Sequence, residues 1–205
     1  MQPSQIGSFL TVLITALLLA TGCATNPVTG EREFSIVSES REIDIGSKQF
    51  LPTQQMQGGQ YQIDAELSNY VGQVGQRLAA VSDRRLPYEF VVLNNSSPNA
   101  WTLPGGKIAV NRGLLLELDS EAELAAVLGH EIVHAAARHG AKSMQRGMLM
   151  QGAVMVTAVA TSEQKYNDYI VQGAALGAQL INQRHGRSAE RDSDYYGMQY
   201  MARAG

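Results

Sequence analysis

The sequence predicts an α+β fold that is mostly helical, with a small antiparallel sheet beside one apolar helix. Two observations support this fold class. Apolar residues recur at helical spacing on both sides of a short central region, and that region is rich in β-branched and aromatic residues. The chain has 205 residues, of which 44% are hydrophobic and 17% charged, so it is long enough for one domain with a sizeable core.

The charge of the chain argues against one class of partner. The formal net charge is −3 at pH 7, and no long run of Lys or Arg occurs. Binding to nucleic acid depends largely on a basic surface that neutralises phosphates. We therefore expect no nucleic-acid partner.

The N-terminus has the layout of an export signal. Residues 6–20 are an apolar block, and the first charged residue of the chain is Glu31. Fifteen apolar residues fit a secretory signal and are short for a membrane-spanning helix. The sequence "ATGC" follows and ends at Cys23, the single cysteine, which resembles a bacterial lipoprotein signal with a lipidated cysteine. Ala20 replaces the usual Leu, so an ordinary signal peptide or an uncleaved anchor with an incidental cysteine stays the alternative.

Three segments are expected from this reading. Residues 1–22 are a lipoprotein-type signal peptide, residues 23–38 a tether with turn-forming Asn-Pro and Thr-Gly pairs, and residues 39–205 the folded domain. Ala24 is not the Asp that favours retention at the inner membrane in enteric-type lipoproteins. By that resemblance, the anchor places the protein in the periplasm, at the outer membrane. A single cysteine excludes an internal disulfide.

The first half of the domain is expected to begin with helices. A helix is predicted over 39–50, ending before Pro52, because proline disfavours the helical conformation of the residue before it. Residues 53–62 are polar and contain glycine, which predicts a loop. The next helix has its apolar residues on one face: Ile63, Leu67, Tyr70, Val71, Val74 and Leu78.

The central region predicts strands. Residues 88–93, "YEFVVL", are β-branched and aromatic and follow a proline. The segments "AWTL" (100–103) and "KIAV" (107–110) flank the turn "PGG", which predicts a β-hairpin.

The second half of the domain is predicted to be helical. In the first helix, Ser120 and Glu123 form a capping box at the start, and Arg138, His139 and then Gly140 mark the end. Residues 148–160 are strongly apolar, but thirteen residues do not span a bilayer, so a buried core helix is expected. A further helix is predicted over 169–183, a break over 182–187, and a final helix from 188.

The capped helix carries three polar residues on an otherwise apolar stretch: His130, Glu131 and His134. Histidines four apart on a helix project from one face and can hold one zinc ion, with the glutamate close to a water on the metal. The alternative is a pair of hydrogen-bonded core histidines and a buried glutamate. Burying such groups without strong partners costs about 1–3 kcal/mol each, which favours the metal.

A catalytic zinc usually needs a third protein ligand and leaves a fourth position open. In the final helix, Glu190 and Asp194 are four apart on one face, and Asp192 lies on the other side. A pair of this kind is common on exposed helices and gains its meaning only from the zinc motif. We expect His139, at the helix end, and His185, in a loop, to face solvent.

Four segments, in this order, resemble the HtpX, BepA and LoiP group of bacterial zinc metallopeptidases, the gluzincins of peptidase family M forty-eight, which have a zincin-like fold. These segments are "NPVTGEREFSIVSESREIDIG" (26–46), "NAWTLPGGKIAV" (99–110), "LAAVLGHEIVHAAARH" (124–139) and "RSAERDSDYYG" (187–197), the last with Ser193 in the usual Ala position.

The resemblance implies a role for each site residue. It implies that His130, His134 and Glu190 bind one Zn²⁺, that Glu131 is the general base and acid, and that Asp194 supports a ligand. It also implies that the 99–110 hairpin has an edge strand that pairs with extended substrate. Members of the family continue well beyond the point eleven residues after Asp194 where this chain stops, so we expect the metallopeptidase domain to be truncated at its C-terminal end.

The function expected from these observations is a zinc endopeptidase, anchored to the outer membrane, that cleaves misfolded or unassembled envelope proteins. One rival is a chaperone-like or scaffold lipoprotein of outer-membrane assembly that keeps zinc but rarely cleaves. Another is an integral-membrane protease with residues 148–160 in the bilayer.

Overall fold

The computed structural model describes residues 23–162 and 167–205, apart from the side chains of residues 23, 167 and 180–185. The expected signal peptide, 1–22, lies outside the described residues. Two short strands, β1 (Cys23–Thr25) and β2 (Arg32–Phe34), precede the helices α2 (Glu39–Met56) and α3 (Ala65–Ala80). Three strands follow: β3 (Glu89–Leu93), β4 (Ala100–Leu103) and β5 (Lys107–Asn111). The chain ends with α4 (Arg112–Leu115), α5 (Glu121–Ala136), α6 (His139–Ala160) and α7 (Asn167–Ala204).

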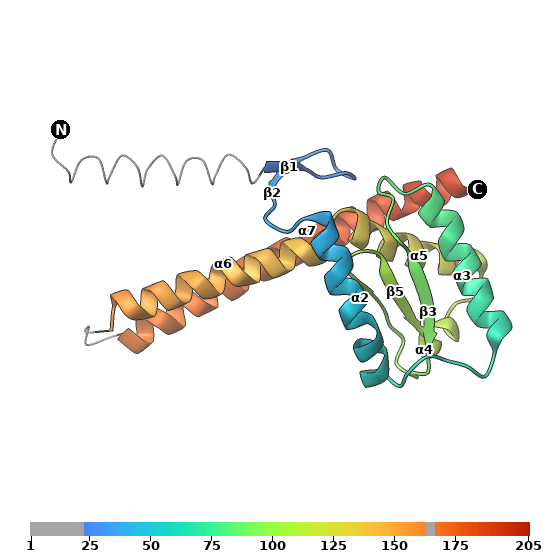
Figure 1. The fold of residues 1–205 in the computed structure, drawn as a ribbon, viewed down its shortest axis with the longest axis horizontal. Helices are drawn as coiled ribbons and strands as arrows, with labels where there is room; N and C mark the ends of the chain where they lie inside the picture. Colours follow the sequence, from blue (N-terminus) through green and yellow to red (C-terminus); the bar gives the residue numbers. More distant parts are fainter. Residues whose placement is uncertain (1–22, 163–166) are drawn as a thin grey trace.

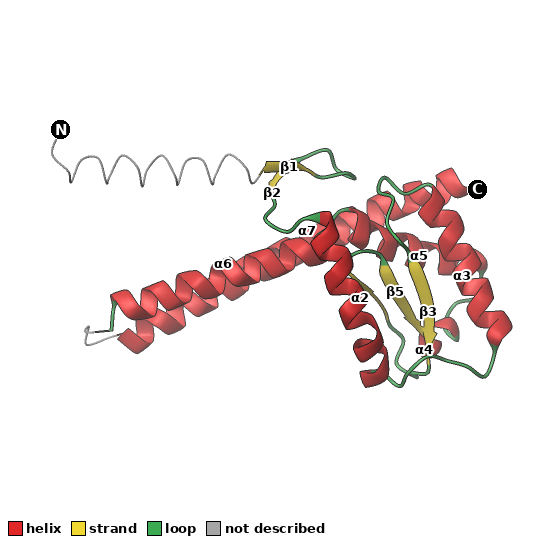
Figure 2. Ribbon diagram, viewed as in Figure 1, coloured by secondary structure: helices red, strands yellow, loops and turns green. Residues whose placement is uncertain are grey.

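The central sheet has the strand order β3-β5-β4. Figure 2 shows β3 and β5 side by side. As predicted, β4 and β5 form an antiparallel hairpin, with Thr102 opposite Ile108. Strand β3 pairs with β5 in parallel, because the chain leaves β3, passes to the far edge of the sheet as β4 and returns as β5. The fold class is confirmed: the molecule is mostly helical with small sheets, and β4 is an edge strand.

Helices cover both faces of this sheet (Figure 1). On one face, the core joins alternate strand residues to α3 and α5 through Val92, Ile108 and Val110 of the strands, Val71, Val74 and Leu78 of α3, and Leu128, Ile132 and Val133 of α5. On the other face, Phe50 of α2 packs against Val91, Leu93 and Ala109. Because side chains alternate along a strand, both faces of the sheet contribute to the core.

Helix α2 continues past the proline that was expected to end it. Pro52 lies inside the helix, so the predicted end at residue 50 is wrong. Proline removes one hydrogen bond of the helix and crowds the preceding turn. Tertiary contacts support the turn that follows: Gln54 is buried, and Trp101 Nε1 donates to Gln57 Oε1 at 3.1 Å. Packing against the sheet thus outweighs the local preference.

Helix α5 begins as predicted and ends earlier than predicted. Ser120 Oγ accepts from the Glu123 backbone N–H, as the capping box requires. The helix ends at Ala136, and Arg138 takes the left-handed conformation with φ 63° and ψ 28°. Gly140 is already inside α6, so the stop assigned to it is wrong. A left-handed non-glycine residue costs roughly 1–3 kcal/mol, which the contacts of the Arg138 side chain offset.

Helices α6 and α7 form a long hairpin that projects from the rest of the domain (Figure 1). The expected buried helix over 148–160 is wrong, because this part of α6 is largely exposed, as at Met155 (70%) and Val159 (71%). The expected break over 182–187 is also wrong, since α7 is one continuous helix of 38 residues. Within the described ranges, no helix has the length and apolarity needed to span a membrane.

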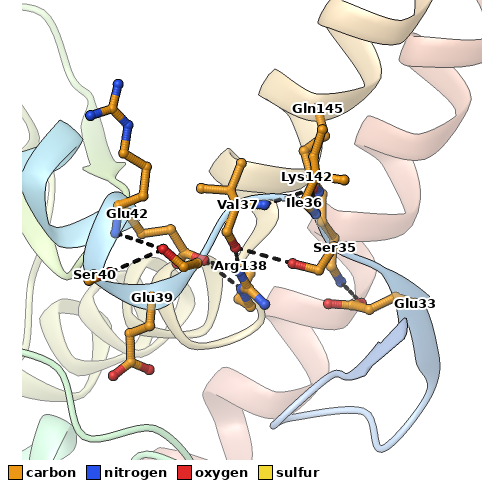
Figure 3. A network of polar contacts seen from close by, with 12 residues as sticks. Glu33, Ser35, Ile36, Val37, Glu39, Ser40, Glu42, Arg138, Lys142 and Gln145 are labelled. Carbon is orange, nitrogen blue, oxygen red and sulfur yellow. Dashed lines mark hydrogen bonds and ion pairs between the residues drawn. The ribbon is translucent and has the colours of Figure 1, made fainter. Parts of the chain in front are cut away.

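The segment expected as a tether is packed on the domain (Figure 3). Strands β1 and β2 pair with each other, with Cys23 opposite Phe34. Glu33 forms an ion pair with Lys142 of α6 at 2.5 Å, and Gln145 Oε1 accepts from the backbone N–H groups of Ile36 and Val37. Residues 32–38 are therefore held along the base of α6.

Candidate metal centre and cleft

The residues expected to bind zinc lie together. His130 and His134 project from α5 with their Nε2 atoms 3.0 Å apart. Glu190, from α7, has Oε2 3.3 Å from His130 Nε2 and Oε1 3.6 Å from His134 Nε2. One ligand atom from each of these residues lies within 4.8 Å of the others. Two imidazoles and one carboxylate converging in this way are a donor set that suits zinc.

Two glycines bring α5 and α7 close enough for this convergence. A Cβ atom on Gly197 would lie 2.9 Å from the His130 backbone nitrogen, and one on Gly129 would lie 3.0 Å from the Gly197 carbonyl oxygen. Neither side chain could be added without moving backbone atoms. The absence of both therefore sets how closely Glu190 approaches the histidines.

The outer nitrogen of each histidine has a hydrogen-bond partner. Asp194 Oδ1 is 2.9 Å from His130 Nδ1, and because a carboxylate can only accept, the imidazole hydrogen is on Nδ1. His139 Nδ1 is 3.1 Å from His134 Nδ1, and Ser193 Oγ is 3.4 Å from the same atom of His139. Both contacts leave Nε2 of the ligand histidines free to point to a metal.

Two other polar residues considered in the sequence, His139 and Asp192, lie outside the candidate metal site. His139 is 8% exposed, so the expectation that it faces solvent is wrong. The turn at residue 138 places it at the start of α6, against His134, and a spacing of five residues gave no signal for that contact. Asp192 lines a separate cavity with Lys142, on another side of α7 as expected. The His185 side chain lies outside the described residues.

Glu131 is held by a residue that the sequence analysis did not identify. Thr102 Oγ1, on β4, lies 2.6 Å from Glu131 Oε2 and donates to it, and the Glu131 carbonyl oxygen lies 3.0 Å from the same hydroxyl. Burial raises the pKa of the Glu131 carboxyl. The only available signal for Thr102 was its place in the hairpin, where alternate residues share a face.

The imidazoles of His134 and His139 are in an environment that favours their neutral form. Burial lowers the pKa of His134, and burial lowers the pKa of His139 to about 3. A neutral imidazole is the form that binds a metal and the form that can accept a hydrogen bond from a neighbouring ring. The environment of this cluster is therefore compatible with metal binding at neutral pH.

A cleft lies along the edge strand at this site. A cavity of about 420 Å³ is bounded by Trp101, Thr102, Leu103 and Pro104 on one side and by the metal-site residues on the other. A second cavity of about 660 Å³ continues past His130 and Glu190 towards Asn99 and Met198. An edge strand has backbone groups free to pair with an extended peptide, so the cleft has the form of a peptide site.

The sequence is similar to those of known peptidases. The family model described as "Peptidase family M48" matches residues 65–205. A beta-barrel assembly-enhancing protease of Yersinia pestis is 30% identical over 153 residues, which are 69% of this chain and 30% of the relative. The protein of that name from Escherichia coli is 27% identical over 203 residues, 96% of this chain and 41% of the relative.

A mitochondrial relative shares the same region. Mitochondrial metalloendopeptidase OMA1 of Schizosaccharomyces pombe is 32% identical over 136 residues, 66% of this chain and 39% of the relative. The chain thus spans less than half the length of each of these three relatives. The family match covers most of the chain, including α5, α7 and the strands of the cleft, and it implies a divalent metal. The chain belongs to peptidase family M48.

Proposed function

We propose that the chain is the catalytic part of a zinc-dependent endopeptidase. The observation that carries this proposal is the convergence of His130, His134 and Glu190 beside Glu131, at the base of a cleft along an edge strand. A metal-binding scaffold would need the three donors. It would not need an additional part-buried carboxylate, fixed by Thr102, at the side of the cleft.

The residues divide the chemistry between them. Zinc, when bound, acidifies the attacking water and polarises the carbonyl of the peptide bond. His130, His134 and Glu190 would hold it, and Asp194 and His139 keep the two rings oriented. Glu131 accepts the proton of the water and gives it to the leaving amine. Thr102 positions that carboxylate, while the backbone of β4 aligns the substrate as an added strand.

Replacement of the base tests the proposed mechanism. Glu131→Gln keeps the shape of the side chain and cannot accept a proton, so cleavage of casein should fall about 10²–10⁴-fold while zinc content stays at one per chain. Glu66→Gln, an exposed carboxylate in the first turn of α3, is the control and should cleave like the parent. Chelation should abolish cleavage by the parent. Equal rates for Glu131→Gln and the parent would refute the mechanism.

The same experiment separates the scaffold alternative. A zinc-binding chaperone or scaffold would retain zinc, bind unfolded casein and leave it intact at every zinc concentration. Cleavage that is lost with chelator and restored by zinc would exclude that alternative.

We also propose that the protein is a periplasmic lipoprotein of the outer membrane that acts on misfolded or unassembled envelope proteins. The support is the signal-like block before Cys23 and the name of the bacterial relatives, beta-barrel assembly-enhancing protease. Intact mass spectrometry should find the mature chain beginning at an acylated Cys23, and Cys23→Ser should block processing or release the protein. An unmodified cysteine in the mature chain would refute the anchor.

A further inference from the structure

The α6–α7 hairpin exposes an unusual amount of apolar surface. We call the exposed large apolar residues of its two arms the hairpin stripes: Met148, Leu149, Met155, Val156 and Val159 on α6, and Tyr169, Ile170 and Leu176 on α7. On each helix, these positions lie within about 120° of arc at the spacing of an ideal helix, so each arm has one continuous apolar face. Contiguous exposed patches of this kind mark interaction surfaces.

The arms also lack charge. Residues 147–162 and 169–183 contain no Asp, Glu, Lys or Arg. A helix that faces water normally carries charged residues on its outer face. Within α6, the fourteen uncharged residues 147–160 form an arm of about 21 Å at 1.5 Å per residue, and part of α7 runs beside it.

The charges at the base of the hairpin indicate what covers the stripes. On α7, Arg187 and Arg191 follow the stripe of that helix on the same helical face, at about 0° and 40° from Tyr169. Asp194 lies on this face too, at about −20°, but its carboxylate is bonded to His130 of α5. Both side chains are exposed and make no ion pair with a described residue. An apolar face that leads into unpaired arginines matches the acyl boundary and the anionic headgroups of a phospholipid bilayer.

The position of the hairpin relative to the N-terminal strands also favours a membrane as the partner. Phe34 and Ile36 are exposed, at 43% and 54%, beside the base of α6. Phe34 lines a cavity of about 400 Å³ together with Leu149, and it pairs directly with Cys23 across β1 and β2. The other walls of this cavity are largely polar, but Leu149 of the stripes and the partner of Cys23 line the same space. This closeness to an anchor rests on the proposed function, whereas the stripes and arginines do not.

We propose that the hairpin lies flat on an anionic bilayer, with its stripes in the interface between headgroups and acyl chains and Arg187 and Arg191 at the phosphates. Amphiphilic helices of this type bury their apolar face about 5–10 Å deep. A second contact beside Cys23 would fix the orientation of the cleft relative to the membrane.

Labels at single sites test the contact in the full chain. Cys23→Ser removes the only cysteine, and Met155→Cys or Leu176→Cys then introduces one for an environment-sensitive fluorophore. Leu116→Cys is the matched control, because Leu116 is 75% exposed and follows α4, on the body of the domain. The probe is a vesicle of phosphatidylethanolamine and phosphatidylglycerol containing brominated lipid, with phosphatidylcholine vesicles for comparison.

The expected result is a blue shift and bromine quenching at positions 155 and 176 and neither at 116. Arg187→Gln and Arg191→Gln should each weaken binding to the anionic vesicles about fivefold and leave binding to phosphatidylcholine unchanged. Labels at 155 and 176 that behave like the label at 116 would overturn the proposal. A blue shift of these labels with unfolded casein, without quenching by brominated lipid, would also overturn it, because the stripes would then be a polypeptide-binding surface. Casein cleavage by the same variants is read separately, so a failure of the protease mechanism would not be mistaken for a failure of the membrane contact.

Discussion

Replacement of Glu42 should destabilise the domain more than any other single loss of charge on α2. The Glu42 side chain is 1% exposed, and its carboxylate accepts hydrogen bonds from two guanidinium groups. Arg84 Nη1 donates to Oε2 at 2.8 Å. Arg138 Nε donates to Oε1 at 2.5 Å (Figure 3). Glu42→Gln keeps the volume and removes the charge that compensates both arginines.

The size of the effect depends on the contacts that each arginine keeps. Arg84 still bonds to Glu39 at 3.0 Å and to the Ala135 carbonyl oxygen at 3.2 Å. Among the residues that the structure describes, Arg138 keeps only the Val37 carbonyl oxygen as an acceptor, so its charge is left largely uncompensated at 12% exposure. Breaking a buried pair in this way costs about 3–5 kcal/mol. For a domain of this length, that is roughly 6–20 °C in Tm.

Thermal and urea unfolding would measure the change, with Asp44→Asn as the matched control. Asp44 lies two residues further along α2, in an exposed arrangement with Arg41 and Lys48, and its replacement should leave Tm within about 2 °C of the parent. Adding Arg138→Met to Glu42→Gln should recover part of the loss, because the uncompensated charge is gone. A Tm for Glu42→Gln equal to that of Asp44→Asn would refute the reasoning.

Three further outcomes are expected. Gly197→Ala should lower the zinc affinity in a chelator titration and reduce the free energy of unfolding by about 1–3 kcal/mol, because its Cβ would meet the backbone of α5. Gly186→Ala, with open space around the added Cβ, should change neither quantity. Burial raises the pKa of Tyr88 to about 12. The neutral phenol therefore contributes its full share to the free energy of unfolding below the unfolded-state pKa near 10, and this share is lost as the pH rises through 12. In urea unfolding at pH 12, Tyr88→Phe should avoid about 2 kcal/mol of the loss that the parent shows. In dialysis against graded chelator, Asp194→Ala should lose zinc about 10–100-fold more readily than the parent, and Glu190→Ala more readily still.

Local signals in the sequence predicted several elements well. Ser120 marked the start of α5, and "PGG" marked the turn of the β4–β5 hairpin, because caps and turns are determined by a few neighbouring residues. The spacing of His130 and His134 on one helix, and of Glu190 and Asp194 on another, likewise predicted which residues share a face. The structure brings the two pairs together, although the contacting residues are more than fifty positions apart in the sequence.

Features that depend on distant contacts were not predictable in the same way. Nothing local indicates that β3 pairs with β5 in parallel, because the pairing depends on how the chain passes from one edge of the sheet to the other. The apolar composition of 148–160 predicted burial, yet burial requires a partner surface, and this part of α6 extends beyond the body of the domain. Pro52 stays helical because the turn after it packs on the sheet.

The left-handed turn at Arg138 connects the ionic cluster to the metal centre. Its backbone conformation sets the angle at which α6 leaves α5, and His139, the first residue of α6, is thereby placed 3.1 Å from His134. The contact of Arg138 with Glu42 offsets the cost of that conformation, so the loss of Glu42 should loosen the turn and weaken the support of His134 as well. Glu42→Gln should therefore lower zinc affinity in the folded protein, whereas Asp44→Asn should not. A variant that lost stability but kept parental zinc affinity at a temperature where it is fully folded would show that the turn is held without the Glu42 carboxylate.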